Sequence, residues 1–131
     1  MPAKMPDPPR PTDGELEILT VLWERGPSTV RDVHEAVARR KATQYTTVLK
    51  LLQIMAEKRL VRRDERQRAH VYEADRPREW TQRQLAGDLL QRAFGGSAKS
   101  LILGALSARK ASAKELAEIR GLLEEYAKGG R

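Results

Sequence analysis

The sequence predicts a mainly α-helical protein that carries one small β-hairpin. Residues 43–59 have apolar side chains at the i, i+3, i+4, i+7 spacing of a helix packed on a core. Two short runs typical of strands follow at once, at residues 60–63 and 70–73, with a basic turn between them. A helix followed by a basic hairpin is the winged helix-turn-helix arrangement, and we expect a helical domain after it. The apolar positions of the helix are Val48, Leu51, Leu52 and Met55.

Two further helices are expected before this unit. The first begins at a capping box formed by Thr12 and Glu15, and a Gly-Pro pair ends it at residue 26. A short stretch that suits either an edge strand or an N-cap leads into the second, which runs to about Arg39. A short link then joins it to the third helix, for which Thr43 is the expected N-cap. The expected buried positions of the first two helices are Leu16, Leu19, Leu22, Trp23, Val30, Val33 and Val37.

The last third of the chain is expected to form helices that need a partner. Pro77 suits the first turn of a new helix, and helices are predicted at 78–94, at 97–106 and after a second capping box at Ser112 and Glu115. Three such helices are too few to bury their own apolar faces. A second copy of the chain is the simplest partner, and folding back on the chain's own winged helix is the alternative. We therefore expect a homodimer with contacts at Leu89, Phe94, Leu101, Ile102, Leu116, Ile119, Leu123 and Tyr126.

Basic residues are concentrated on the predicted third helix and the hairpin. The window 39–70 has ten basic and three acidic residues, which accounts for the whole net charge of +7. Scattered charge usually only solvates a surface, but an excess gathered in this one window around the third helix and the hairpin indicates a polyanion partner. Double-stranded DNA is the expected partner, because the polar first two turns of the third helix suit a major groove.

The chain is thereby divided into three parts. Residues 1–11 hold five of the seven prolines and have no apolar period, so a disordered N-terminal lead is expected. The winged-helix DNA-binding domain is assigned to residues 12–75, and the helical dimerisation domain to residues 76–131.

Composition argues against catalysis and against a bound metal or cofactor. The chain has no cysteine, which excludes disulfides, thiol nucleophiles and cysteine-based metal or redox sites. Its two histidines are not paired at ligand spacing, and it has no glycine-rich phosphate loop. We expect no enzyme activity. Because no run of 18 apolar residues and no apolar leader is present, we expect a cytoplasmic protein without membrane insertion.

The expected DNA contacts lie on the third helix and the hairpin. Thr46 and Thr47 offer a methyl group or a hydroxyl to a base edge or a phosphate, and Lys50 can reach O6 and N7 of guanine. Basic side chains beside the helix would bind the backbone or the minor groove. The remaining expected contacts are Gln44 and Gln53 at adenine edges, Tyr45 at a phosphate or in the core, and the basic residues Arg40, Lys41, Arg62, Arg63, Arg66 and Arg68.

Four segments, taken in order, match the pattern of a known family. They are Leu16–Trp23, Tyr45–Leu52, Arg68–Tyr72, and Gly95-Gly96-Ser97 followed by Leu101. With these segments the chain resembles the penicillinase repressor family of bacterial regulators (the BlaI, MecI and CopY repressors) from about Thr12 to Tyr126. The resemblance implies a winged-helix domain, a helical dimerisation domain and repression of a nearby operon. Carried over by position, it implies DNA contacts at Thr46, Thr47, Lys50 and Arg68.

Two features depart from that family. Its copper-responsive members release DNA through clustered C-terminal cysteines, which this chain lacks. Its β-lactam-responsive members resemble substrates of a sensor protease cut at an Asn-Phe bond, whereas this chain has no asparagine and Phe94 follows Ala93. The family resemblance still makes a membrane sensor protease one candidate partner. Because both known signals lack their residues here, the signal that relieves repression stays open.

Two functions fit these expectations. The first is a repressor that binds a palindromic operator as a homodimer and blocks a promoter. The alternative is a winged helix used as an architectural or protein-interaction module without strong sequence preference. A preference of roughly a thousandfold or more for a palindrome over random DNA separates the first from the second.

Overall fold

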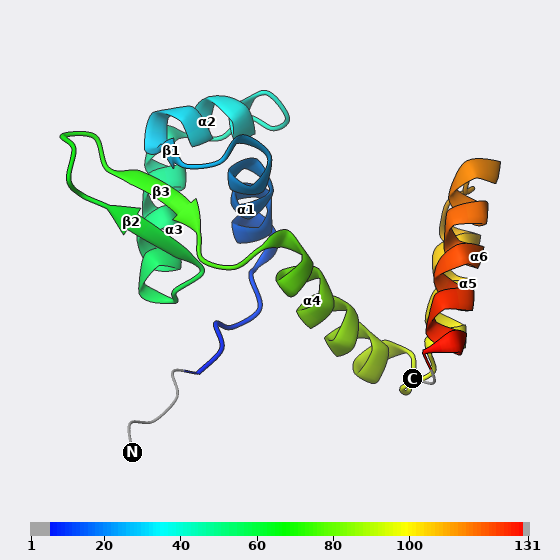
Figure 1. The fold of residues 1–131 in the computed structure, drawn as a ribbon. Helices are drawn as coiled ribbons and strands as arrows, with labels where there is room; N and C mark the ends of the chain where they lie inside the picture. The colour runs from blue at the N-terminus through cyan, green and yellow to red at the C-terminus, as the bar shows by residue number, and fades with distance from the viewer. Residues whose placement is uncertain (1–5, 130–131) are drawn as a thin grey trace, which may run out of the picture. The chain divides into compact units, whose positions relative to one another are not determined.

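The computed structural model describes residues 6–129 and confirms a mainly helical chain with one small antiparallel sheet (Figure 1). The winged helix-turn-helix order is present, with further helices after it. The elements are α1 (Asp13–Arg25), β1 (Ser28–Thr29), α2 (Val30–Ala38), α3 (Tyr45–Glu57), β2 (Val61–Asp64), β3 (Val71–Ala74), α4 (Arg78–Ala93), α5 (Ala98–Ala108) and α6 (Ala113–Lys128).

The sheet has the strand order β1-β3-β2, and both pairs are antiparallel. Strands β2 and β3 are the predicted hairpin moved one residue toward the C-terminus, with Val61 opposite Ala74. The segment expected to be an edge strand or an N-cap is both, because Ser28 pairs with Tyr72 and the next residue caps α2. Residues 65–70 form an exposed loop that projects from the body of the unit (Figure 1). This hairpin is the wing.

The core lies where α1, α2 and α3 pack against one another and against the sheet. The apolar stripe predicted on α3 is confirmed at Val48, Leu52 and Met55, which have no exposed surface. Leu51, the fourth predicted member, is only half-buried because it lines a hollow beside α1. With its apolar stripe turned inward, α3 presents its polar face to the outside.

The buried face of α1 differs from the one that hydropathy predicts. Its stripe is Glu15, Ile18, Leu19 and Leu22, again at i, i+3, i+4, i+7 spacing, whereas Leu16 is only half-buried. The predicted capping box is confirmed: the Thr12 amide donates to Glu15 Oε1 at 2.9 Å, and the Glu15 amide donates to the Thr12 hydroxyl. Because the stripe begins with a charged residue, hydropathy could not find its first member.

Glu15 is 1% exposed and accepts a hydrogen bond from Lys58 Nζ to its Oε2 at 2.8 Å. Lys58 is the C-cap of α3, so this ion pair joins the first turn of α1 to the last turn of α3. Burial of the carboxyl by itself raises its pKa. The hydrogen bonds from Lys58 and Thr12 outweigh that effect and leave the pKa of Glu15 below its ordinary value.

The start of α3 corrects the prediction that Thr43 is its N-cap. The N-cap is Gln44, whose side chain makes no capping hydrogen bond. The Thr43 hydroxyl instead donates to the Lys41 carbonyl at 2.8 Å, and the Thr43 carbonyl lies 2.7 Å from His34 Nε2. Since both bonds hold the link between α2 and α3, Thr43 stabilises the turn of the helix-turn-helix and not the helix end.

The described residues up to Ala86 form one compact unit, and those from Gly87 form another. This division falls inside α4. The predicted boundary between the two domains lies earlier in the chain, between residues 75 and 76, and it remains a prediction. In the lead, where disorder is predicted, residues 6–11 have no helix or strand but Pro8 is buried; residues 1–5 lie outside the described part. Between Gly87 and Gly129 the structure describes no buried residue.

The C-terminal unit contains a double-glycine turn between α4 and α5, and both α5 and α6 start at a serine cap. Ser97 accepts from the Ser100 amide and Ser112 from the Glu115 amide, so only the first half of the capping box predicted at Ser112 forms. Gly95 and Gly96 have φ values of 56° and 82°, which a residue with a Cβ adopts only with strain. Phe94 is half-buried, with its ring 3.3 Å from the position that a Cβ on Gly104 would occupy.

Candidate nucleic-acid interface

The outer face of α3 carries the side chains predicted to read bases. Thr46, Thr47, Lys50 and Gln53 are all exposed, because the apolar stripe of the helix is turned into the core. Among the described residues Lys50 has no acidic partner, so its ammonium group is available to an external acceptor. This face can offer hydroxyl, amide and ammonium groups to the edges of bases, which is the chemistry of major-groove readout.

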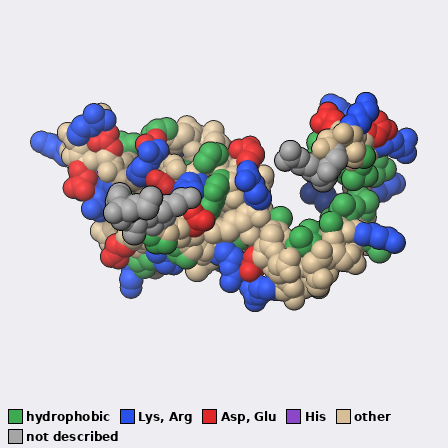
Figure 2. Space-filling view, turned by 60° about the horizontal axis from the view of Figure 1, so that its bottom comes forward, with side chains coloured by type: hydrophobic (Ala, Val, Ile, Leu, Met, Phe, Trp, Pro, Cys, Tyr) green, Lys and Arg blue, Asp and Glu red, His purple; other side chains and the backbone are tan. Residues whose placement is uncertain are grey.

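The wing arginines differ in how strongly acidic neighbours hold them. Arg62 reaches Glu73 at 3.2 Å, and Arg63 Nε donates to Glu65 at 3.0 Å. Arg66 is held most firmly, because its guanidinium and its amide all donate to Asp64, the shortest bond being 2.7 Å. These bonds lower the pKa of Asp64 to about 2. At the wing, the left end of Figure 2, basic and acidic side chains accordingly lie side by side.

Arg68 is the wing arginine with no acidic partner in the described part of the chain. It lines a groove of about 550 Å³ between α3 and the wing. The same groove brings together three more of the predicted site residues, Tyr45, Gln53 and Arg63. Residues of α3 and of the wing therefore line one groove, together with an arginine that has no acidic partner in the described residues.

Seven of the eleven residues that line this groove lie outside the predicted site, and three of them, Thr29, Arg31 and His70, can contribute polar or basic groups. Thr29 and Arg31 come from the start of α2, and His70 comes from the wing just before β3. The signal that the sequence offers for Arg31 is a basic residue one position after the start of the second helix, on a different face from Val33. Only the pairing of β1 with β3 brings that helix end beside the wing.

Tyr45 does not take the core position that was one of its two predicted roles. Its side chain is 46% exposed, so it is not a core residue, and its ring packs edge-on against His34 with 5.7 Å between the ring centres. His34 also contacts the Thr43 carbonyl in the link between α2 and α3. The ring of Tyr45 is therefore held in place through His34. Its position at the groove keeps the predicted phosphate contact open.

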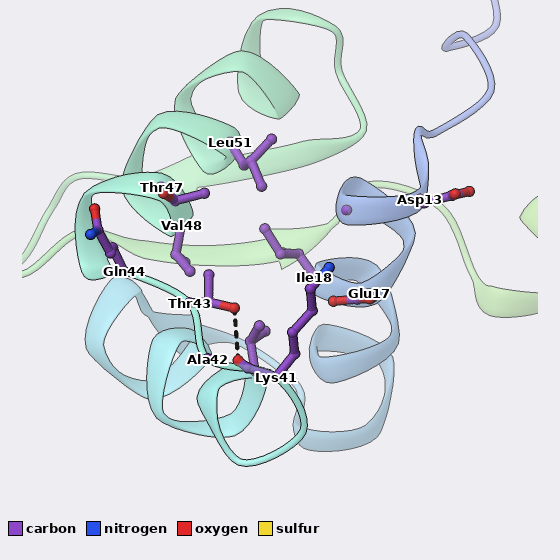
Figure 3. A pocket seen from close by; sticks show the side chains of 12 residues that line it. Asp13, Glu17, Ile18, Lys41, Ala42, Thr43, Gln44, Thr47, Val48 and Leu51 are labelled. Carbon is purple, nitrogen blue, oxygen red and sulfur yellow. Dashed lines mark hydrogen bonds between the residues drawn. The ribbon is translucent and has the colours of Figure 1, made fainter.

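A second hollow, of about 370 Å³, lies on the other side of α3, between α1 and the α2–α3 turn (Figure 3). It brings together Lys41, Gln44 and Thr47 from the predicted site. Figure 3 shows Lys41 reaching across from the turn toward Ile18 and Glu17 of α1. Arg40 lies apart from both hollows and pairs with Glu24 at 3.8 Å.

The residues predicted to form the dimer lie on helices that leave their apolar side chains largely exposed. Leu89, Ile102, Leu116, Leu123 and Tyr126 are exposed, with Leu123 at 55% and Tyr126 at 67%. The other predicted members, Phe94, Leu101 and Ile119, are half-buried. Figure 2 shows hydrophobic side chains, in green, at the surface of the C-terminal unit at its right. An apolar face of this extent is typical of a binding surface.

Metal sites and membrane spans are absent from the part of the chain that is described. No group of three or more His, Cys, Asp or Glu side chains within residues 6–129 could hold a metal ion. None of the described helices has the length and hydropathy to cross a bilayer.

Comparisons with known proteins agree with this architecture. The family model described as "Penicillinase repressor" matches residues 11–125. Two proteins named transcriptional regulator BlaI, from two strains of Mycobacterium tuberculosis (CDC 1551 / Oshkosh and ATCC 25618 / H37Rv), are each 47% identical over 62 residues, covering 45% of this chain and 45% of each of them. The match thus spans less than half the length of these relatives.

A third relative matches over most of its length. The penicillinase repressor of Staphylococcus aureus is 19% identical over 114 residues, which cover 87% of this chain and 90% of that protein. The family model spans α1 to α6 almost completely and includes both the winged helix and the C-terminal helices. The chain belongs to the penicillinase repressor family.

Proposed function

We propose that this protein is a transcriptional repressor that binds a palindromic operator as a homodimer and blocks a promoter. The observation that carries the proposal is the surface formed by the outer face of α3 and the wing. Lys50 and Arg68 are cations of that surface without an acidic partner in the described residues, and Thr46, Thr47 and Gln53 of α3 are exposed as well. Membership of a family of repressors supports the same function and argues against an enzyme.

In this proposal α3 reads the DNA bases, and the wing binds the DNA backbone. Thr46, Thr47 and Lys50 would contact base edges in the major groove, while Tyr45 and Arg68 would contact phosphates beside it. Phosphate contacts release counterions, so we expect affinity to fall steeply with salt. No covalent chemistry is needed: occupancy of the promoter is the mechanism.

Dimerisation is assigned to the exposed apolar face of the C-terminal unit. A two-fold dimer presents two recognition helices to two half-sites, which is why a palindrome is the expected operator. For derepression we propose a signal of unknown kind, and cleavage by a membrane sensor protease is one candidate. The family's Asn-Phe bond is absent, so such a protease would have to cleave another bond.

The test of this function is binding to the DNA upstream of the protein's own gene, with random DNA as competitor. We expect a preference of roughly a thousandfold or more and a protected palindrome of two half-sites. Equal affinity for both DNAs would favour the alternative, an architectural or interaction module. In that case the base-reading roles of Thr46, Thr47 and Lys50 would also be wrong.

Separate substitutions distinguish recognition of the DNA bases from binding of the DNA backbone. Lys50→Ala is expected to lower the preference for operator over random DNA, at a cost of about 1–3 kcal/mol on the operator. Arg68→Ala is expected to weaken both DNAs equally and to reduce the salt slope by about 1. Binding isotherms at several salt concentrations measure both effects.

Arg66→Ala is the matched control on the wing. Its guanidinium is held by Asp64, so its removal is expected to change affinity less than Arg68→Ala does. If the two arginine variants behave alike, local pairing does not decide which wing cations bind DNA. If Lys50→Ala weakens both DNAs equally, the division between reading helix and wing is wrong.

A further inference from the structure

Both tryptophans of the chain lie where α4 leaves the winged-helix unit. Trp23, near the end of α1, donates its indole N–H to the Arg76 carbonyl at 3.0 Å. The Arg76 guanidinium lies 4.3 Å from the ring centre of Trp80, and that of Arg78 lies 5.6 Å from the ring centre of Trp23. Two stacked cation–aromatic pairs joined by a hydrogen bond hold the first turn of α4 against α1.

The N-terminal lead adds a second layer to this junction. Asp7 pairs with Arg76 at 3.6 Å, Pro8 is buried, and Gln84 Nε2 donates to the Pro8 carbonyl at 2.9 Å. The other amide atom of Gln84, Oε1, is buried without a hydrogen-bond partner in the described residues. An unsatisfied buried acceptor is costly, so a glutamine free to turn to solvent would not stay in this position.

We propose that these contacts form a junction clamp that determines which half-site spacing the dimer accepts. The clamp consists of Asp7, Pro8, Trp23, Arg76, Trp80 and Gln84, and its contacts hold α4 as far as Gln84. The proposal rests on the proposed function, because spacing has meaning only for a dimer on a palindrome. A fixed direction of α4 fixes the orientation of each recognition helix relative to the helix that leads to the dimer contacts.

Gly87 lies just beyond the clamped part of α4. It follows Ala86, at the division between the two compact units, and it is exposed within the helix. A glycine inside a helix loosens it, because the backbone has more freedom in the unfolded state. A Cβ at this position would meet nothing within 4 Å, so Gly87→Ala is sterically free. Gly87→Ala should therefore stiffen the junction, whereas Asp7→Ala combined with Gln84→Ala should loosen it.

The experiment measures binding of the full-length dimer to its palindrome with the half-site separation changed by −1, 0, +1 and +2 base pairs. Each inserted pair turns one half-site by roughly 34° and moves it by roughly 3.4 Å. For the wild type we expect affinity to fall about tenfold or more at one added pair. Asp7→Ala with Gln84→Ala is expected to reduce that fall to about threefold, and Gly87→Ala to increase it.

Amide hydrogen exchange of residues 78–86 supplies a readout that does not depend on DNA. We expect the Asp7→Ala, Gln84→Ala protein to exchange about tenfold faster there than the wild type. Gln82→Ala and Arg83→Ala are the matched controls, because both positions are exposed on the same helix and should change neither measurement.

The outcomes separate the clamp from the proposed function. Unchanged exchange in the double variant would overturn the clamp. Faster exchange with an unchanged spacing profile would overturn its role in spacing. A wild type that prefers no palindrome at any separation would overturn the proposed function and the spacing role with it, while exchange would still decide whether the clamp exists.

Discussion

Leu123→Glu is expected to convert the protein into a monomer that binds its operator at least about a hundredfold more weakly. Leu123 is 55% exposed on α6, so a carboxylate there meets solvent in the monomer and costs the fold little. In a dimer that buries this face, the same carboxylate would be desolvated without a partner. Each half-site would then be bound separately, and the gain from linking two recognition helices would be lost.

Sedimentation velocity and operator binding measure the two effects of this change together. Ala117→Glu is the matched control, because it adds the same carboxylate to α6 on the side opposite the predicted dimer residues and is exposed. The control should stay dimeric and bind normally. A Leu123→Glu protein that remains dimeric would show that the apolar face of α6 is not the interface. Circular dichroism would verify that helix content is retained in both variants.

Lys58→Met is expected to destabilise the winged-helix unit by roughly 2–4 kcal/mol at neutral pH. It leaves the Glu15 carboxylate buried with only Thr12 as a partner, and an uncompensated buried charge is costly. We expect a loss of unfolding free energy at the lower end of the range for broken buried ion pairs, because the Lys58 side chain is itself 34% exposed and water screens its charge. Unfolding in urea measures the loss.

The dependence of this loss on pH identifies its cause. In the wild type the native pKa of Glu15 is lowered, so the stability it contributes is complete above the ordinary pKa of about 4.5 and is lost as pH falls through the lowered native pKa. Removing Lys58 raises the native pKa relative to the wild type. The difference in unfolding free energy between the two proteins should therefore shrink as the solution is acidified below about pH 5.

Two outcomes would contradict this explanation. A difference that stays constant from pH 7 to pH 3 would assign the loss to packing of the lysine side chain and not to the ion pair. A loss below 1 kcal/mol at pH 7 would mean that water reaches Glu15. Glu57→Met serves as the control, since it places the same side chain on the neighbouring exposed position at the end of α3.

The order of elements and most helix ends could be predicted from the sequence, because both depend on short-range patterns. Thr12 with Glu15 forms the capping box that its spacing indicates, and Val48, Leu52 and Met55 form the buried stripe of α3. Thr43 shows the limit of such rules. It has the chemistry of an N-cap, but its hydroxyl has a closer acceptor in the preceding turn.

Candidate DNA contacts could be named one by one from the sequence, but the sequence could not predict how the charges of these residues are paired. All the predicted DNA-contact side chains are exposed, in agreement with a surface role. Four wing arginines look equivalent in the sequence, yet Asp64 holds Arg66 while Arg68 has no acidic partner in the described residues. Arg31 was not predicted at the groove. It lies beside the wing only because β1 pairs with β3, a strand more than forty residues away in the sequence.

The sequence by itself determined the kind of protein: a chain of short helices with one hairpin, a basic surface on the third helix and hairpin, and unpartnered apolar stripes at the C-terminal end. Periodicity, caps and charge excess are local properties, so they can be read without coordinates. The tertiary structure alone decided that Glu15 is buried against Lys58 and that Gln84 meets Pro8 across 76 residues of chain. Such contacts depend on which distant segments pack together, and no local pattern records that.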